Sequence, residues 1–159
     1  MTSWLTQTVA GKALFTFFIS MLPVIELRAG LPYGIALGLD YPIALTMAVL
    51  GNMLPVPFVI VYIRKIFHWL HRISPWCERV VSALERKAHL KGKTVQKYSA
   101  LGLCILVAIP LPGTGAWTGA LAAAFLDIRL KRAVPAIFLG VCIAAAIMTV
   151  LTFGVLKIV

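Results

Sequence analysis

The sequence predicts an all-α membrane protein built from two inverted halves. Three observations predict this fold class: the composition is very apolar, the charges are confined to short segments, and breaks rich in proline and glycine recur at matching places. Of the 159 residues, 61% are hydrophobic and 13% are charged, whereas about a quarter of the residues of a soluble globular domain are charged. We therefore expect a single membrane domain over residues 1–159.

The positions of the basic residues argue against a nucleic-acid partner, despite the formal net charge of +10. Nine of the fifteen Lys and Arg residues lie between positions 64 and 97, and three more lie between positions 129 and 132. Basic segments beside apolar spans are typical of cytoplasmic loops. We expect residues 64–97 to form an amphipathic cytoplasmic linker that binds membrane lipids.

The first half, about residues 10–63, begins with two apolar runs that are too short to cross a membrane. Residues 13–22 and 33–39 flank a tip, residues 23–32, that contains Glu26 and Arg28 between prolines. Crossing the hydrocarbon core takes about 20 residues of helix. This pattern predicts a re-entrant helical hairpin, whose broken tip must be buried in protein or line a wet cavity.

The run from residue 43 to residue 63 is long enough to cross the membrane. Pro55 and Pro57 interrupt it and should kink the helix and free backbone carbonyls near its middle. Asn52 precedes these prolines. Two roles are open for its amide: capping the freed carbonyls or contacting a substrate.

The second half, about residues 98–157, has the same order of elements. An apolar run over 99–109 leads to a broken tip at 110–117, a second short run follows at 118–126, and residues 133–156 are long enough to cross. A hairpin plus one crossing makes an odd number of crossings per half. The halves must therefore be inverted. Because the linker between them is expected in the cytoplasm, both termini are expected outside.

A shift of 87 positions aligns the two halves. It superposes Pro23 on Pro110 and Asp40 on Asp127. Inverted repeats with broken helices are typical of secondary transporters, in which the substrate binds near the midplane where the repeats meet. We expect the two tips to converge there.

Glu26 and Arg28 are the first candidate site residues, because an ionised side chain at membrane depth costs about 2.5–3.5 kcal/mol and needs a use. On an extended tip, alternate side chains share one side. Arg28 suits an anionic group, since guanidinium binds oxygens bidentately. Burial favours a neutral carboxyl, so Glu26 is the predicted proton-coupling residue. A structural Glu26–Arg28 ion pair is the alternative.

The second tip supplies the other candidate substrate-binding residues. With Asn52 these are Pro110, Gly113, Thr114, Gly115 and Trp117. Backbone amides and a hydroxyl at the start of a half-helix form a natural anion site. The alternative is a tight turn with Trp117 as an interfacial anchor. We expect no enzyme, metal or cofactor, because no nucleophile and base set or metal-ligand cluster is present and the three cysteines are widely spaced.

Two motifs carry a resemblance to a known family. ELRAGLPYG at residues 26–34 and PLPGTGAW at residues 110–117 resemble the bacterial putative small multidrug export protein family, and the likeness covers about residues 23–153. The layout is also similar to the DedA family, whose paired hairpins are associated with moving lipid-linked phosphates such as undecaprenyl phosphate. The resemblance implies a multi-pass protein of the bacterial inner membrane.

The sequence thus predicts a secondary transporter that exports small molecules or drugs, with its substrate site between the two tips. A DedA-like translocase of lipid-linked phosphate and a non-transporting membrane assembly factor are the alternatives. A homodimer is expected, because 159 residues are few for a closed transport path.

Overall fold

The structure, a computed structural model, describes residues 8–73, 92–110 and 114–156. These residues are predominantly helical and contain no strand. The helices are α2 (Val9–Ser20), α3 (Glu26–Ala36), α4 (Tyr41–Met53), α5 (Pro55–Ile73), α7 (Gly92–Ala108), α8 (Ala116–Phe125) and α9 (Leu130–Leu156). The prediction of an all-α fold is confirmed for the described part of the chain.

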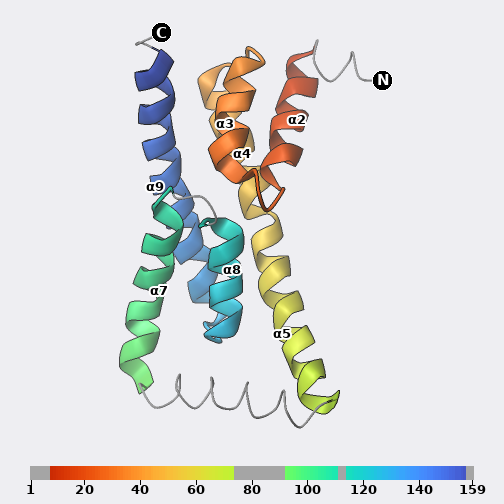
Figure 1. Cartoon of the computed structure of the whole chain (residues 1–159), viewed down its shortest axis with the longest axis vertical. Helices are drawn as coiled ribbons and strands as arrows, with labels where there is room; N and C mark the ends of the chain where they lie inside the picture. The colour runs from red at the N-terminus through yellow and green to blue at the C-terminus, as the bar shows by residue number, and fades with distance from the viewer. Residues whose placement is uncertain (1–7, 74–91, 111–113, 157–159) are drawn as a thin grey trace.

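The helices α2 and α3 form a hairpin in one half of the molecule (Figure 1). Thr8 caps α2 by accepting a hydrogen bond from the Gly11 amide at 3.1 Å, which satisfies one of the free amides of the first turn. The chain turns after Ser20, and α3 begins at Glu26, whose φ is +50°. With 12 and 11 residues, these helices reach about 17–18 Å, roughly half of a bilayer crossing.

The helices α4 and α5 follow one another along the full height of the molecule (Figure 1). The break between them falls at Leu54. Pro55 and Pro57 have no amide hydrogen to donate to the carbonyls of the preceding turn, which explains the interruption. The predicted position of this break is confirmed.

The helices α7 and α8 form the second hairpin, which approaches the middle of the molecule from the other end (Figure 1). α8 is only 10 residues long. The 27-residue α9 then runs the height of the molecule, so that the start of α2 and the end of α9 lie at the same end.

Small residues let these helices pack closely. A side chain at Gly51 of α4 would overlap the Phe17 carbonyl of α2, and one at Gly34 of α3 would press on Thr16 and Ala44. The halves also pack against each other, because α5 contacts α8 of the second half and α9 contacts α3 of the first. Each long helix therefore joins its own hairpin to the opposite one.

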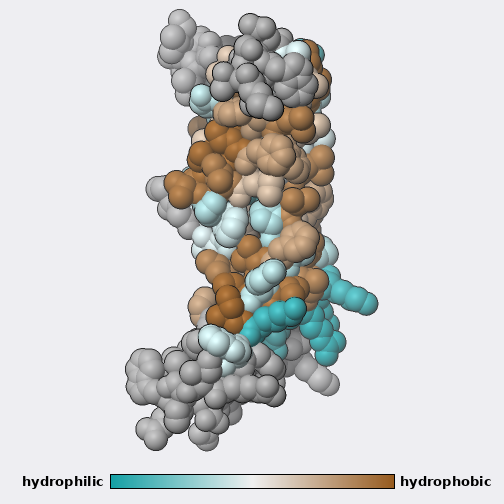
Figure 2. All heavy atoms as spheres, turned by 90° about the vertical axis from the view of Figure 1, so that its right-hand side faces the viewer, coloured by the Kyte–Doolittle hydropathy of each residue, from teal (hydrophilic) through white to brown (hydrophobic). Residues whose placement is uncertain are grey.

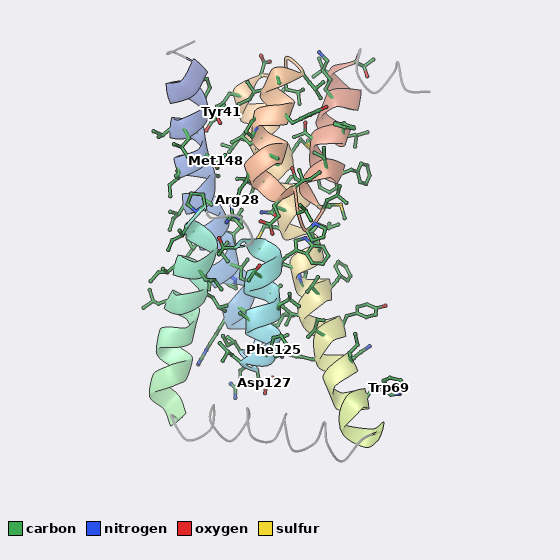
Figure 3. All side chains as sticks on the ribbon, viewed as in Figure 1. Arg28, Tyr41, Trp69, Phe125, Asp127 and Met148 are labelled. Atoms are coloured by element: carbon green, nitrogen blue, oxygen red, sulfur yellow. The ribbon has the colours of Figure 1, made fainter. Side chains whose placement is uncertain are left out.

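Two helical stretches are long and apolar enough to cross a membrane: Tyr41–Ile66, with 26 residues, and Leu130–Gly154, with 25. Hydrophobic side chains cover much of the face in Figure 2, and strongly hydrophilic ones gather near one end. Asp127, which Figure 3 labels at this end, pairs with Arg64 of α5. Lys65 follows Arg64, and three more basic residues lie around the start of α9: Arg129, Lys131 and Arg132.

The prediction of an extended tip over residues 23–32 is wrong, because α3 is already helical from Glu26 and contains Pro32 in its interior. A proline in a helix interior removes one backbone hydrogen bond, and α3 packs against α2 and α4. The helices also extend into the predicted linker, since α5 continues to Ile73 and α7 begins at Gly92. Residues 74–91 of that linker lie outside the described residues.

Candidate functional site

The two hairpin tips meet near mid-height, beside a small cavity. Figure 3 shows Arg28 at this level, with Tyr41 toward one end of the molecule and Asp127 toward the other. The cavity has a volume of about 10 Å³, which is about the lower limit for one water molecule. Its polar and charged lining residues are Glu26, Arg28 and Asn52.

Glu26 joins the first tip to the start of α8. It is only 5% exposed, and its Oε1 accepts a hydrogen bond of 3.3 Å from the backbone amide of Trp117. A helix N-terminus offers free amides and a positive dipole, so a carboxylate is well placed there. The predicted anion site of the second tip is therefore occupied by the chain's own Glu26.

Gly115 makes this approach possible. It precedes α8 with φ +158° and ψ −162°, a region adopted almost only by glycine. A β-carbon at this position would overlap the Glu26 carboxylate. The glycine thus allows both the turn into α8 and the close contact between the tips.

Arg28 makes the second link between the tips. Its Nη2 donates to the Ile109 carbonyl at 3.0 Å and to Thr114 Oγ1 at 2.9 Å. Thr114 Oγ1 donates in turn to the Ile109 carbonyl at 2.8 Å. Hydrogen bonds from an ionised donor are stronger than neutral ones, so Arg28 fastens the end of α7 and the entry to α8 onto α3.

Trp117 makes the third link. Its indole Nε1 donates to the Met21 carbonyl at 3.0 Å, and Met21 is the C-cap of α2. This bond satisfies a free carbonyl at the end of the opposite hairpin.

Asn52 reaches the cavity from the end of α4. It is 3% exposed, and its Oδ1 has no hydrogen-bond partner among the described residues. No hydrogen bond of Asn52 to a backbone carbonyl is found there either, so the capping role has no support in the described residues. Buried polar atoms are nearly always paired, which makes this orphaned oxygen notable.

The structure brings most of the predicted site residues together. The cavity is lined by Glu26, Arg28, Asn52 and Gly115. Thr114 accepts a hydrogen bond from Arg28, and the Trp117 amide donates one to Glu26. Pro110 lies beside Ile109 without lining the cavity, and Gly113 lies outside the described residues. Glu26 and Arg28 line one cavity although the tip is not extended. Glu26 is the first residue of α3, and its φ is not helical, so the regular helical spacing of side chains does not apply between these two residues.

Sequence reasoning missed the partners that act through their backbone and the apolar wall of the cavity. The carbonyls of Met21 and Ile109 accept the tip hydrogen bonds, and Val141 and Ala144 of α9 line the cavity. Apolar residues in a long apolar helix carry no sequence signal that separates a cavity wall from a lipid-facing surface.

Two further contacts join the halves, one at each end of the molecule. At the basic end, Arg64 Nη2 of α5 pairs with Asp127 Oδ1 at 3.5 Å and donates to the Ile128 carbonyl. At the other end, the hydroxyls of Tyr41 and Thr149 share a hydrogen bond of 2.8 Å. Each long helix therefore holds a segment of the opposite half.

The chemistry of this site is that of a carboxyl, a guanidinium and an amide around a water-sized space. The described residues contain no group of three or more His, Cys, Asp or Glu that could hold a metal ion. Such a set of groups can bind a polar solute or exchange a proton.

Comparison with known proteins gives one match. No curated protein and no solved structure matches the chain. A family model described as Putative small multi-drug export protein matches residues 26–147, which include α3 through most of α9, residues 26–32 of the first tip and all of the second tip. With the two apolar helices, this match indicates a membrane protein and is consistent with a transporter. The match extends over most of the chain, which therefore belongs to the Putative small multi-drug export protein family.

Proposed function

We propose that the protein is a secondary transporter that exports small molecules, and that its halves are inverted re-entrant repeats. The arrangement of the helices supports this proposal. Each hairpin starts from one end of the molecule and turns near the middle, and the two hairpins start from opposite ends (Figure 1). Broken helices whose tips meet at the midplane form the substrate sites of many secondary transporters.

One observation carries the proposal: Glu26, Arg28 and Asn52 lie together at the junction of the two tips, where the surrounding helices are apolar. Charged and polar groups at this depth are costly and typically mark a substrate or ion path. Three hydrogen-bonded links between the tips form the boundary of the site, namely Glu26 with Trp117, Arg28 with Ile109 and Thr114, and Trp117 with Met21.

We assign this arrangement to a closed state of such a carrier. A cavity of about 10 Å³ is far smaller than the several hundred Å³ of a typical small-molecule site. Substrate entry therefore requires the tips to separate, which breaks the links made by Arg28 and Trp117. Because these links join the two hairpins, their opening exposes the site.

We favour export of small molecules over translocation of a lipid-linked phosphate. The phosphate would bind at the N-terminus of α8, but the carboxyl of Glu26 takes up the Trp117 amide there. An anionic head group would have to displace this carboxyl. A neutral or cationic substrate faces no such competition from the chain.

The orientation follows from charge. The basic residues Arg64, Lys65, Arg129 and Lys131 lie at one end of the molecule, which we assign to the cytoplasm of a bacterial cell by the positive-inside tendency. The start of α2 and the end of α9 then lie outside, and the first hairpin enters from that side.

The proposal predicts proton-driven transport that depends on Glu26. The purified protein in proteoliposomes should accumulate fluorescent amphiphilic cations when a proton gradient is imposed. Glu26→Gln should reduce this uptake to the leak of empty liposomes, because an amide cannot exchange a proton. Asp40→Asn, which removes an exposed carboxylate near one end, should transport like the wild type.

Failure of the wild-type protein to move any dye of the panel under any ion gradient would favour the alternative of a non-transporting assembly factor. Full activity of Glu26→Gln would instead reject Glu26 as the coupling residue while leaving transport in place.

A further inference from the structure

The orphaned oxygen of Asn52 and the sparsely bonded carboxyl of Glu26 face the same small cavity. Asn52 Oδ1 is a buried acceptor without a donor. Among the described residues, the Glu26 carboxyl accepts one hydrogen bond, the long one from the Trp117 amide to Oε1. An ionised carboxylate offers about four acceptor sites, so a single bond leaves a buried carboxylate poorly compensated.

A neutral Glu26 carboxyl both supplies a donor for Asn52 Oδ1 and removes the poorly compensated buried charge. Its O–H group is the donor that Asn52 Oδ1 lacks, while Oε1 keeps its bond to the Trp117 amide. The cavity that both residues line has a volume of about 10 Å³, about the lower limit for one water molecule, and such a molecule can relay a hydrogen bond between two polar partners.

We propose that the cavity is a binding site for the coupling proton, held as a neutral Glu26 carboxyl that donates, through one water molecule, to Asn52 Oδ1. This inference rests on the proposed transport function, and it adds Asn52 as the residue that positions the proton. The proton arrives on Glu26 when the tips open to one side and leaves when they open to the other. No bond other than O–H changes in the step.

The other groups around Glu26 decide how strongly the proton is held. From its own helix, Arg28 is the charged group that faces the cavity, and it favours the ionised form. The described lining residues from α7, α8 and α9 carry no charge, and α4 contributes the amide of Asn52. Asn52 and Arg28 therefore act in opposite directions on the same carboxyl.

A metal or sodium ion fits this cavity less well than a proton and a water molecule. Hard cations bind six or more oxygen ligands, whereas the described side chains that line the cavity provide three oxygens, two from Glu26 and one from Asn52.

Infrared titration of the purified protein in lipid tests the proposal directly. The chain has only five Asp and Glu residues, so the carbonyl band of a protonated buried carboxyl can be assigned by its loss in Glu26→Gln. In the wild type this band should disappear as the pH rises. In Asn52→Leu it should disappear at a pH about one unit lower, because the neutral form has lost its acceptor.

In Asn52→Asp the band of the last protonated carboxyl should disappear at a pH about one unit or more higher than in the wild type, because two carboxylates in one small cavity do not ionise together. Asn52→Ala provides a second variant without an acceptor, in case leucine is not accommodated. Monodisperse elution in detergent shows that each variant is folded. A merely structural role of Asn52 does not produce shifts of opposite sign.

Equal titration midpoints in the wild type, Asn52→Leu and Asn52→Ala would overturn the proposal, as would a band that responds to sodium and not to pH. The outcome is independent of transport. Shifts of opposite sign in a protein that moves no dye would support the proton site and reject the transporter. Dye transport with unshifted bands would support the transporter and reject the proton site.

Discussion

Gly115→Ala is expected to abolish transport and to lower the thermal stability of the protein sharply. The backbone at Gly115 has φ +158° and ψ −162°, a conformation that costs other residues about 1–3 kcal/mol. A β-carbon would also overlap the Glu26 carboxylate. The Glu26 carboxylate must therefore move away from the start of α8, which breaks its hydrogen bond with the Trp117 amide. Thermal unfolding in detergent and dye uptake in proteoliposomes measure both effects.

Gly102→Ala is the matched control. Gly102 lies on an exposed face of α7, and a β-carbon there would meet no atom within 4 Å. Alanine is favoured over glycine in a helix by about 1 kcal/mol, so this variant should be as stable as the wild type or slightly more stable. Wild-type stability and uptake in Gly115→Ala would contradict the tip geometry.

Arg28→Ala is expected to be the second most damaging change. It removes the two hydrogen bonds that Arg28 donates to Ile109 and Thr114, and a hydrogen bond to a charged group contributes about 1.5–3 kcal/mol. The Ile109 carbonyl keeps its bond from Thr114, so the loss should stay near the lower end of that range. Thermal unfolding and coupled dye uptake should both fall.

The control for Arg28→Ala is Arg129→Ala, which removes an exposed guanidinium at the basic end. This control should retain its stability and uptake in proteoliposomes. Arg28→Lys should fall between the two, because an ammonium group keeps the charge but lacks the planar fork. If Arg28→Ala and Arg129→Ala had equal effects, Arg28 would matter only through net charge.

The break points of the fold could be predicted from the sequence because proline and glycine act locally. Pro23 marks the turn after α2, and Pro55 marks the break between α4 and α5. The helical start at Glu26 could not be predicted, since Pro32 lies inside α3. Tertiary packing overrides the local preference of that proline.

The candidate side chains could be predicted because charge in an apolar segment stands out, but their partners could not. Arg28 contacts residues 81 and 86 positions away, and Arg64 contacts Ile128 across 64 positions. No local pattern encodes such pairings. The position of Ala144 in the cavity wall could not be predicted either, because α9 is apolar along nearly all of its length.

The central claim is that the cavity between the tips opens during transport, and the reactivity of a cysteine in its wall tests this most directly. Ala144 lines the cavity and is only 5% exposed. In a background with Cys77, Cys104 and Cys142 replaced by serine, Ala144→Cys should be inert to a membrane-impermeant thiol reagent at rest. It should become labelled during dye transport.

Ala120→Cys provides the control, because Ala120 of α8 is also buried, with 0% of its surface exposed, but does not line the cavity. It should stay unlabelled in both conditions. Labelling of Ala144→Cys should appear only with transport and should be lost when Glu26→Gln is added. Labelling that is absent during active transport, or that is equal at Ala120→Cys, would contradict it.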